Sequence, residues 1–321
     1  MSDKIAADIT TIMVSYNTES LLPKAINTLR DAATGFRLKI VIIDNVSRDG
    51  SVSLIRRDFP DCILIENKKN VGFGRANNQA LSLIEGRYVL LLNTDAFVSP
   101  DTLEKTIAYM DKNRKCGVLG VKLVGREGDL QPSCRYFPTP LNLFLQRTGL
   151  NRLFPGTRLV DDMSWNHDLA RECDWVPGCY FLLRKEVIEE IGLFDERYFL
   201  YCEEVDLCFS AKKAGWQVHY YPGTTVIHLG GESAKTDNQI TDSGLQVEKF
   251  QIESELLYFR KNYGLNAVIL HVMLNMITDF ISPIKRLLKR SRPVGWRECW
   301  RHVLLYWSLC WKTKLGSNPT R

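Results

Sequence analysis

The sequence predicts an α/β protein with a doubly wound, mostly parallel sheet and a C-terminal helical appendage. The first hundred residues alternate apolar runs of strand length with amphipathic stretches of helix length. The runs IVIID and YVLLLN are apolar throughout, which is typical of parallel strands that helices cover on both faces. These two observations place the sheet in the first part of the chain.

The expected elements follow one another in the order βαβαβαβ. Strands are expected at residues 9–15, 38–44, 62–66 and 88–93. Helices are expected between them, at residues 21–33, 52–59 and 75–84. In such sheets ligands bind beyond the carboxyl ends of the strands, so the polar residues at those ends are candidate site residues.

Polar side chains end three of these strands. Ser15 and Asn17 follow the first strand, Asp44 ends the second, and Asn93 and Asp95 follow the last. Because the carboxyl ends of parallel strands meet at one edge of the sheet, we expect these side chains to converge there.

The rest of the chain divides into an insertion and a tail. Residues 125–175 have charges, prolines and few periodic runs, which predicts a long irregular insertion next to the site. Loops of this kind often select a substrate. We expect a catalytic domain at residues 1–240 and a basic, Trp-rich helical region at residues 241–321.

The composition favours an ordinary globular protein of the cytoplasm. Apolar residues make up 45% and charged residues 25% of the chain, which excludes the disordered and fibrous classes. The nine cysteines include no C-x-x-C pair, so neither a disulfide framework nor a zinc ribbon is expected. The N-terminal residues include two acids and do not resemble a signal peptide.

Positive charge is concentrated at the C-terminal end. Residues 246–321 hold 13 Lys and Arg against 5 Asp and Glu, whereas the rest of the chain holds 29 against 32. Four of the seven tryptophans lie in the same region: Trp296, Trp300, Trp307 and Trp311. Cations beside indoles favour an anionic membrane surface over nucleic acid as the partner.

Two helices are expected in this tail, at residues 265–284 and 296–315. The first is apolar but is interrupted by Asn266, His271, Asn275, Thr278 and Asp279. These polar residues penalise a membrane-spanning helix, whereas a helix lying in the interface could turn them to water. The alternative is that both helices pack on the catalytic domain or in a dimer.

The loop 44–51 has two interpretations. Its polar side chains, Asp44 first among them, could hydrogen-bond a base and a ribose. Alternatively the same residues form an Asx turn that caps the following helix. The sequence leaves both open.

The loop 70–78 partly matches a dinucleotide-binding fingerprint. Gly72 and Gly74 precede a helix, and Asp95 follows about 20 residues later. Asn77 replaces the third glycine and the loop follows the third strand, so a nicotinamide cofactor is not predicted. The glycines still allow a ligand to approach the backbone closely.

Asn93 and Asp95 are spaced to face the same way if the segment is extended. Such a pair could hold a divalent cation that carries a diphosphate, or it could belong to an ordinary turn before the next helix. His228 ends a strand just before a glycine pair. A lone histidine is more often structural than a ligand, so its role is open.

The acidic run 203–206 opens a helix that is expected to reach about residue 214. A helical wheel places Glu204 near the middle of the apolar arc and Asp206 opposite to it. A carboxylate on a buried face has a raised pKa, as a general base requires. Glu203 and Asp206 fit better as first-turn acids that interact with the helix dipole.

Six motifs occur in a fixed order along the chain: VSYN, IIDNVSRDGS, NVGFGRANN, LLNTDA, WVPGCYFLLRKEVIEEIGLFDERYFLYCEEVDLC and VIHLGG. Together they resemble the family-2 glycosyltransferases of the GT-A fold, most of all bacterial rhamnosyltransferases. The resemblance covers about residues 8–232. It implies a GT-A type, Rossmann-like sheet.

The resemblance also implies a role for each matching residue. The nucleotide-sugar donor would be bound by Ser15, Asn17, Asp44, Asn70, Gly72, Asn77, Asn93 and Asp95. The acceptor side would be formed by Trp175, Pro177, Gly178 and Glu203. Asp95 and His228 would bind Mg²⁺ or Mn²⁺, with Asn93 in place of the first acid of the family's Asp-x-Asp motif. Glu204 matches the catalytic Asp of the family and would be the base.

The reaction so implied is an inverting transfer of a sugar from a nucleotide diphosphate to a hydroxyl group. The resemblance suggests dTDP-L-rhamnose as donor and a lipid-linked cell-surface oligosaccharide as acceptor, in lipopolysaccharide or polysaccharide biosynthesis. We expect a peripheral protein on the anionic inner face of the cell membrane, with no nucleic-acid partner and with a homo-oligomer left open. Two alternatives stand beside it: a nucleotide-sugar-binding module without turnover, and a peripheral membrane scaffold.

Overall fold

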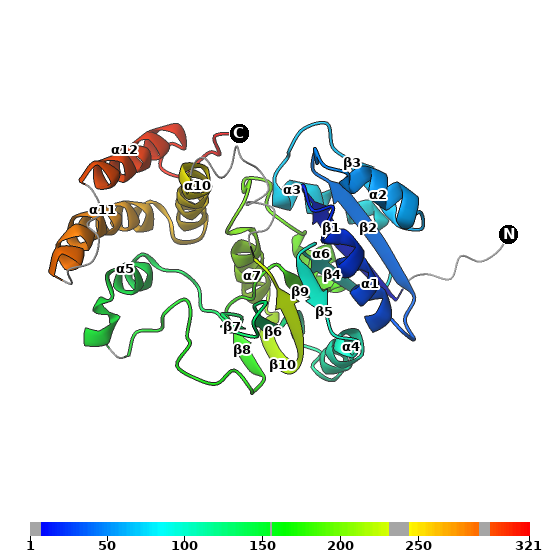
Figure 1. Cartoon of the computed structure of the whole chain (residues 1–321). Coiled ribbons are helices and arrows are strands. Elements are labelled where there is room, and N and C mark those ends of the chain that lie inside the picture. Colours follow the sequence, from blue (N-terminus) through cyan, green and yellow to red (C-terminus); the bar gives the residue numbers. More distant parts are fainter. Residues whose placement is uncertain (1–7, 155, 231–243, 289–295) are drawn as a thin grey trace. The chain divides into compact units, whose positions relative to one another are not determined.

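The structure is a computed structural model, and it describes residues 8–154, 156–230, 244–288 and 296–321 (Figure 1). The chain forms two compact units. The first comprises residues 1–135, 163–196 and 203–243, and the second comprises residues 136–162, 197–202 and 244–321. The helical second unit thus takes in two segments that precede residue 240.

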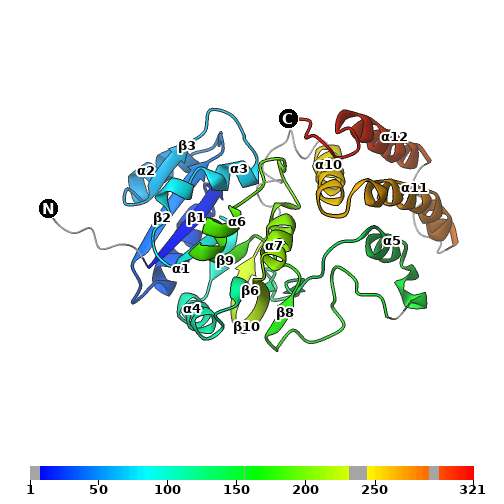
Figure 2. The same ribbon diagram turned by 180° about the vertical axis from the view of Figure 1, so that it is seen from behind.

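One mixed sheet forms the centre of the first unit (Figures 1 and 2). Its main strands lie in the order β3 (Ile63–Glu66), β2 (Leu38–Asp44), β1 (Ile9–Ser15), β4 (Tyr88–Leu92), β9 (Tyr180–Arg184), β6 (Cys116–Val124), β10 (Gln217–His228) and β5 (Ala96–Val98). Two short strands join at the side: β7 (Leu130–Gln131) pairs with β6, and β8 (Arg171–Cys173) pairs with β10.

The sheet is mostly parallel, as predicted. β1 runs parallel to β2 and β4, β2 to β3, and β6 to β10. Strand β9 runs antiparallel to both of its neighbours, β4 and β6, and β5 runs antiparallel to β10. The strands expected at 9–15 and 38–44 match β1 and β2 residue for residue.

Helices connect the strands on both faces of this sheet. Their bounds are α1 Leu22–Ala32, α2 Ser51–Asp58, α3 Phe73–Asn78, α4 Thr102–Lys112, α6 Lys185–Ile191 and α7 Glu203–Lys213. Leu22, Ile26 and Leu29 recur at helical spacing on α1 and are fully buried. They share a core cluster with Met13 of β1, and burying each such side chain stabilises the fold by about 1.5–3 kcal/mol.

The helix expected at residues 75–84 is shorter than predicted. It ends at Asn78, and a 3₁₀ helix follows at Leu81–Leu83. The Asn78 side chain donates to the Phe194 carbonyl at 2.8 Å and accepts from the Phe194 N–H at 3.0 Å. These are tertiary bonds to a residue 116 positions away, which no local pattern reveals.

The insertion expected to be irregular at residues 125–175 contains a helix, α5 (Pro140–Thr148). Thr139 begins it with a capping box: its N–H donates to Asn142 Oδ1 at 2.8 Å, and its Oγ1 accepts from the Asn142 N–H at 3.1 Å. Pro140 occupies the first turn, and Gly149 ends the helix with φ 67°. The prediction therefore missed a local signal.

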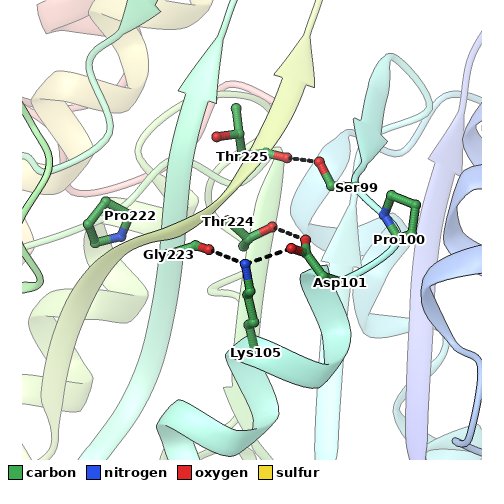
Figure 3. A pocket seen from close by; sticks show the side chains of 8 residues that line it. All are labelled: Ser99, Pro100, Asp101, Lys105, Pro222, Gly223, Thr224 and Thr225. Carbon is green, nitrogen blue, oxygen red and sulfur yellow. Dashed lines mark hydrogen bonds and ion pairs between the residues drawn. The ribbon is translucent and has the colours of Figure 1, made fainter.

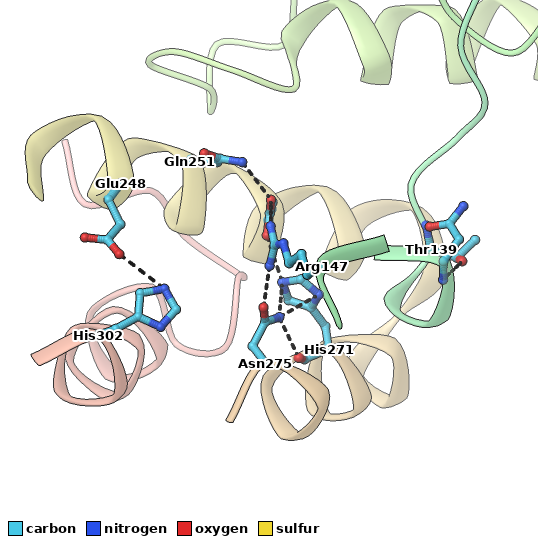
Figure 4. Close-up of polar contacts among 9 residues, drawn as sticks. Thr139, Arg147, Glu248, Gln251, His271, Asn275 and His302 are labelled. Carbon is cyan, nitrogen blue, oxygen red and sulfur yellow. Dashed lines mark hydrogen bonds and ion pairs between the residues drawn. The ribbon is translucent and has the colours of Figure 1, made fainter. Parts of the chain in front are cut away.

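Three further helices complete the second unit: α10 (Gly244–Tyr263), α11 (Leu265–Leu288) and α12 (Trp296–Lys312). A buried polar network joins them to α5 (Figure 4). Arg147 of α5 contacts Glu255 of α10 at 2.7 Å, and Glu255 also contacts His271 Nε2 of α11 at 3.0 Å. Asn275 accepts a hydrogen bond from Arg147, so one guanidinium links three helices.

The network sets the charge of Glu255. Burial alone raises the pKa of this carboxyl, but the Arg147 charge and the hydrogen bond from His271 outweigh it and lower the pKa to about 2. Glu255 is therefore ionised at neutral pH. A buried pair of this kind destabilises the fold strongly when one partner is removed.

Helix α11 is polar inside and apolar outside. His271 and Asn275 are 0% and 4% exposed, whereas Met273 and Phe280 are 55% and 51% exposed. The polar residues of an interfacial helix were expected to face water. His271 and Asn275 instead point inward, because the buried network supplies their hydrogen-bond partners. In the described part of the chain, every helix is too short or too polar to span a bilayer.

We predict that Glu255→Gln destabilises the protein by about 3 kcal/mol at neutral pH, because the neutral amide no longer balances Arg147. The folded-state pKa of Glu255 is lowered, so its stabilisation is present above pH 4.5 and is lost as the pH falls towards 2. Urea unfolding at several pH values, followed by tryptophan fluorescence, measures the difference. A gap between wild type and variant that stays constant down to pH 2.5 contradicts this prediction.

Candidate functional site

The loops after β1 and β2 bond one another. The Asn17 carboxamide oxygen accepts from the Arg48 N–H at 2.7 Å, and the Asn17 N–H donates to Ser47 Oγ at 3.0 Å. Asn17 has φ 54°, a conformation that asparagine tolerates better than most residues. Ser15 is fully buried with its Oγ 3.2 Å from Thr18 Oγ1. Ser15 therefore shapes this loop from within.

The Asx turn before α2 is made by Asp49, whose Oδ1 accepts from the Ser51 N–H at 3.0 Å. Asp44 Oδ2 accepts from the Ser47 N–H at 2.9 Å. Its Oδ1 is buried and has no hydrogen-bond partner among the described residues. An acceptor oxygen left over at the end of a central strand is suited to a ligand hydroxyl or amide.

Asn45, which is not among the predicted site residues, organises the loop after β3. Asn45 Nδ2 donates to Asn70 Oδ1 at 2.8 Å, and Asn45 Oδ1 accepts from the Val71 N–H at 3.0 Å. Asn70 Oδ1 also accepts from the Gly72 N–H at 2.9 Å, and Gly72 has φ 88°. Asn70 thus shapes the glycine turn, which needs a residue without a Cβ.

Asn77 lies inside α3 and away from the surface. It is 1% exposed, and its Nδ2 donates to the Phe73 carbonyl at 2.9 Å. The structure thus gives Asn77 a bond within its own helix.

Asn93 and Asp95 lie in a turn and not in an extended segment. β4 ends at Leu92, and the Ala96 N–H donates to the Asn93 carbonyl at 3.1 Å. The expectation that the two side chains face the same way through a period of two is therefore wrong. The Asn93 N–H donates to the Cys179 carbonyl at 3.0 Å, which ties this turn to the start of β9.

The turn brings Asp95 to His228. Ala96 of β5 pairs with His228 of β10, and the Asp95 carbonyl accepts from the Leu229 N–H at 3.1 Å. Asp95 Oδ1 lies 3.6 Å from His228 Nε2. Burial lowers the pKa of His228, although the Asp95 charge acts to raise it.

This pair suits a divalent cation. A carboxylate oxygen and an imidazole nitrogen are ligands that Mn²⁺ accepts, and carboxylate suits Mg²⁺. Among the described residues, no group of three or more His, Cys, Asp or Glu side chains could hold a metal. Asp95 and His228 would therefore need further oxygen ligands from a substrate or from water.

A strained turn leads into α7. Tyr201 and Cys202 have φ values of 71° and 65°, which are unfavourable for residues with a side chain. Glu203 follows them and opens the helix. Strain of about 1–3 kcal/mol at each such residue persists only where the surrounding structure enforces it.

The helical wheel of α7 was wrong about Asp206, which it placed opposite the apolar arc and which is 2% exposed. Glu203 is 4% exposed, whereas Glu204, expected to point inward, is only half-buried. A Cβ placed on Gly74 would lie 3.8 Å from that of Glu203, so Glu203 faces α3. Packing on several sides of the first turn overrides the single apolar arc that the sequence shows.

Burial raises the pKa of Glu203 and of Glu204. For Glu203 the neighbouring Glu204 charge adds to the effect. For Glu204 the Arg135 charge and backbone hydrogen bonds, one of them from Gly178, act in the opposite direction. One oxygen of each carboxyl is buried without a hydrogen-bond partner in the described structure. Such a carboxyl is suited to accept a proton from a bound hydroxyl group.

The segment that was predicted to lie on the acceptor side lies against Glu204. A Cβ on Gly178 would be 3.9 Å from that of Glu204, and Trp175 and Pro177 precede it on the chain. The Arg135 guanidinium lies 4.0 Å from the centre of the Trp175 ring. Arg135 was missed from the sequence, because no motif there marks a residue that pairs with Trp175 only in the folded chain.

A surface depression of about 530 Å³ lies elsewhere in the first unit (Figure 3). Its polar side chains bond one another: Lys105 contacts Asp101 at 2.6 Å, and Thr224 donates to Asp101 at 3.0 Å. Ser99 donates to the Thr225 carbonyl at 2.8 Å. These groups are paired with one another, and none of them is a predicted site residue.

Comparison with known proteins adds a family and a set of relatives. The family model described as "Glycosyl transferase family 2" matches residues 10–192. The N-acetylglucosaminyl-diphospho-decaprenol L-rhamnosyltransferase of Mycobacterium tuberculosis is 25% identical over 245 residues, which span 70% of this chain and 77% of that protein. The rhamnosyltransferase WbbL of Escherichia coli K12 is 28% identical over 166 residues, 49% of this chain and 60% of WbbL.

Solved structures share the fold at low sequence identity. The mannosyltransferase PcManGT from Pyrobaculum calidifontis, solved with GDP-Man and Mn²⁺, aligns with a TM-score of 0.54 at 15% identity. The alignment covers 98% of this chain and 83% of that one. At this identity the likeness concerns the fold alone.

Proposed function

We propose a specific reaction for this chain, which belongs to glycosyl transferase family 2: transfer of a sugar from a nucleotide diphosphate to a hydroxyl group of a lipid-linked cell-surface oligosaccharide. The chain has the GT-A fold, as the sequence predicted. The best candidate for the donor is dTDP-L-rhamnose. That choice is supported by the names of the Mycobacterium tuberculosis and Escherichia coli relatives, which are 25% and 28% identical.

The observation that carries the proposal is the meeting of two carboxylates at one short segment. The Asn93 N–H, two residues before Asp95, donates to the Cys179 carbonyl at 3.0 Å, and a Cβ on Gly178, the preceding residue, would lie 3.9 Å from that of Glu204. One carboxylate comes from the end of a central strand and the other from the start of α7. A displacement at a sugar carbon needs a base on one side of that carbon and a site for the diphosphate on the other.

In the proposed reaction the acceptor oxygen attacks the anomeric carbon as the bond from that carbon to the diphosphate oxygen breaks. The electron pair of this bond leaves with the diphosphate, and the configuration at the carbon inverts. Glu204 accepts the hydroxyl proton. The raised pKa of Glu204, caused mainly by burial, makes it a stronger base than an exposed carboxylate.

Asp95 and His228 would hold Mg²⁺ or Mn²⁺ in this reaction. The cation, when bound, would neutralise charge that develops on the leaving diphosphate. Asp44, with its unpartnered oxygen, would bind the nucleoside. Trp175 and Arg135 would form one wall on the acceptor side.

Asp95→Ala should abolish transfer and remove the Mn²⁺-dependent part of donor binding, because it deletes the anionic ligand. An assay of sugar transfer to an oligosaccharide acceptor measures the first effect, and thermal shift with a panel of nucleotide sugars, each with and without Mn²⁺, measures the second. A donor present at 100 times its Kd stabilises the wild type by about 2.7 kcal/mol. Asp101→Ala is the control, since Asp101 lines the depression described above.

Three results of these measurements contradict the proposal. An active Asp95→Ala enzyme removes the assigned role of Asp95. A panel in which dTDP-L-rhamnose stabilises no more than other nucleotide sugars removes the choice of donor. Binding without any transfer to an oligosaccharide acceptor favours a binding module instead of an enzyme.

Glu204→Gln should slow transfer by roughly 10²-fold or more and change donor affinity little, because the amide cannot accept a proton. Glu203→Gln is the matched control and should lose less. Because the pKa of Glu204 is raised, the rate of the wild type should fall in acid at a pH above the usual carboxyl range. Kinetics from pH 4.5 to 9 check both points. An inactive Glu203→Gln with a normal Glu204→Gln would exchange the two roles.

We also propose that the second unit binds the anionic membrane surface, which would bring the site to a lipid-borne acceptor. Exposed apolar side chains form one stripe on each of two neighbouring helices, at the spacing of a helix face. The α11 stripe consists of Ile269, Met273, Ile277 and Phe280, and the α12 stripe of Trp300, Leu304, Trp307 and Trp311. Helix α11 exposes its apolar stripe and buries His271 and Asn275. This arrangement is expected of a helix that packs against an apolar partner.

Basic residues beside these stripes favour lipid over protein as the partner. Arg301 and Lys312 are exposed, and each follows a tryptophan of the α12 stripe. A basic residue near an anionic bilayer contributes about 1 kcal/mol, and tryptophan prefers the interface. Of the other basic residues expected to contribute, Lys289, Arg290 and Arg292 lie outside the described residues, as do the side chains of Lys285 and Arg286.

Trp307→Ser with Trp311→Ser should weaken sedimentation with vesicles that contain anionic lipid by roughly tenfold or more, since two exposed indoles are lost. Leu141→Ser with Leu153→Ser is the control, because these residues are also exposed but lie outside both stripes. Point substitutions test this surface better than truncation after Tyr263 would, because truncation removes the partners of Arg147 and Glu255 on α11. Wild-type protein that ignores anionic vesicles at low salt and forms a dimer shows that the stripes pack between copies.

A further inference from the structure

The side chain of Gln131 makes two hydrogen bonds to one residue, His228. Gln131 Nε2 donates to the His228 backbone carbonyl at 2.9 Å, and Gln131 Oε1 lies 3.0 Å from His228 Nδ1. Both contacts have ordinary hydrogen-bond lengths. The Gln131 amide therefore hydrogen-bonds both the ring and the backbone of His228.

This double contact determines where the ring carries its proton. A backbone carbonyl only accepts, so the amide NH₂ of Gln131 must face it and the amide oxygen must face the ring. That oxygen also only accepts, so Nδ1 must be the donor. In a neutral imidazole the other nitrogen, Nε2, then carries a lone pair and no proton.

The lone pair of Nε2 faces a carboxylate. Asp95 Oδ1 lies 3.6 Å away, beyond the usual length of a hydrogen bond. Two acceptors that face each other repel, unless a cation lies near both. The pair is thus set up for a positive ion by the orientation of the ring as well as by the identity of its residues.

The fold builds this arrangement from four strands. β7 carries Gln131 and pairs with β6, β6 pairs with β10, and β10 carries His228 and pairs with β5 beside Asp95. The Ser133 hydroxyl donates to the Gln131 carbonyl at 2.9 Å and accepts from the Leu123 N–H at 3.2 Å. The two-residue strand is thereby held in register.

We propose that Gln131 is a positioning residue that locks His228 in the Nδ1–H tautomer and presents Nε2, with Asp95, to a divalent cation. The cation's part in this rests on the proposed function. The tautomer does not, because it follows from the hydrogen bonds alone. Gln131 itself contacts neither cation nor substrate.

The test reads the tautomer directly. Protein labelled with ¹⁵N at its five histidines gives a long-range ¹H–¹⁵N spectrum, in which a His228→Asn variant identifies the His228 signals. The wild type should show protonated Nδ1 and unprotonated Nε2. Gln131→Leu should shift the ring towards the Nε2–H form, and Gln131→Glu, which keeps an acceptor at Nδ1, should retain the wild-type pattern.

Cation affinity supplies the second reading. Electron paramagnetic resonance of Mn²⁺ titrated in the presence of pyrophosphate should show a loss of about 10–100-fold for Gln131→Leu, the usual effect of removing a partner of a metal ligand. Gln217→Leu is the matched control: Gln217 Oε1 lies 3.2 Å from His219 Nε2, so only the His219 signals should move.

The proposal is overturned if the wild-type ring is doubly protonated or carries its proton on Nε2. It is also overturned if Gln131→Leu leaves both the tautomer and the Mn²⁺ affinity unchanged. Should the wild type prove unable to transfer sugar, the tautomer and Mn²⁺ results still decide the role of Gln131. Failure of the proposed function is therefore distinguishable from failure of this inference.

Discussion

The placement of one antiparallel strand decides where the site lies. β9 pairs antiparallel with β4 and with β6 in a sheet that is otherwise mostly parallel. Since Leu92 pairs with Tyr180, the residues just before β9 meet the turn that follows β4. The bond from the Asn93 N–H to the Cys179 carbonyl fixes that meeting. Gly178 and Asp95 thereby come to neighbouring places, although they are 83 positions apart in the sequence, farther than any local motif spans.

Placing two acidic side chains in a buried, strained part of the fold costs free energy. Burial opposes ionisation of Glu203 and Glu204, and their proximity opposes it further. Two residues with positive φ stand directly before them, which adds backbone strain. Such costs are tolerated where the surrounding packing is extensive, and the buried residues of α7 and the central strands supply it. In the proposed reaction, the burial that raises the pKa of Glu204 would make it a stronger base.

The second unit solves a different physical problem. Its buried network pairs Arg147 with Glu255 inside, and one stripe of apolar side chains on each of α11 and α12 remains exposed. Exposed apolar stripes of this kind are unusual for helices in water. A surface of this kind is stable in solution only at some cost from exposed apolar area, so a partner that covers it gains free energy. The basic residues beside the stripes favour a partner that carries negative charge.

The amino-acid sequence specifies the parallel strands locally, and from it the candidate site was predicted at their carboxyl ends. Apolar runs of strand length, separated by amphipathic helices, specify β1 and β2 without reference to the rest of the chain. The same local reading identified Asp95, Glu204 and His228 as candidates, with the family resemblance supplying their roles. It also contained, unrecognised, the capping box that begins α5 at Thr139.

Only the tertiary structure decided which side chains these residues meet. Gln131 reaches His228 across 97 positions, and Arg135 reaches Trp175 across a bridge that no sequence spacing encodes. The tertiary structure also decides which side chains are buried. Glu203 and Asp206 are buried because other elements cover the first turn of α7. His271 faces inward because it pairs with Glu255 there. Local periodicity reports which face of a segment is apolar, whereas exposure and hydrogen bonding depend on what the rest of the fold places against that face.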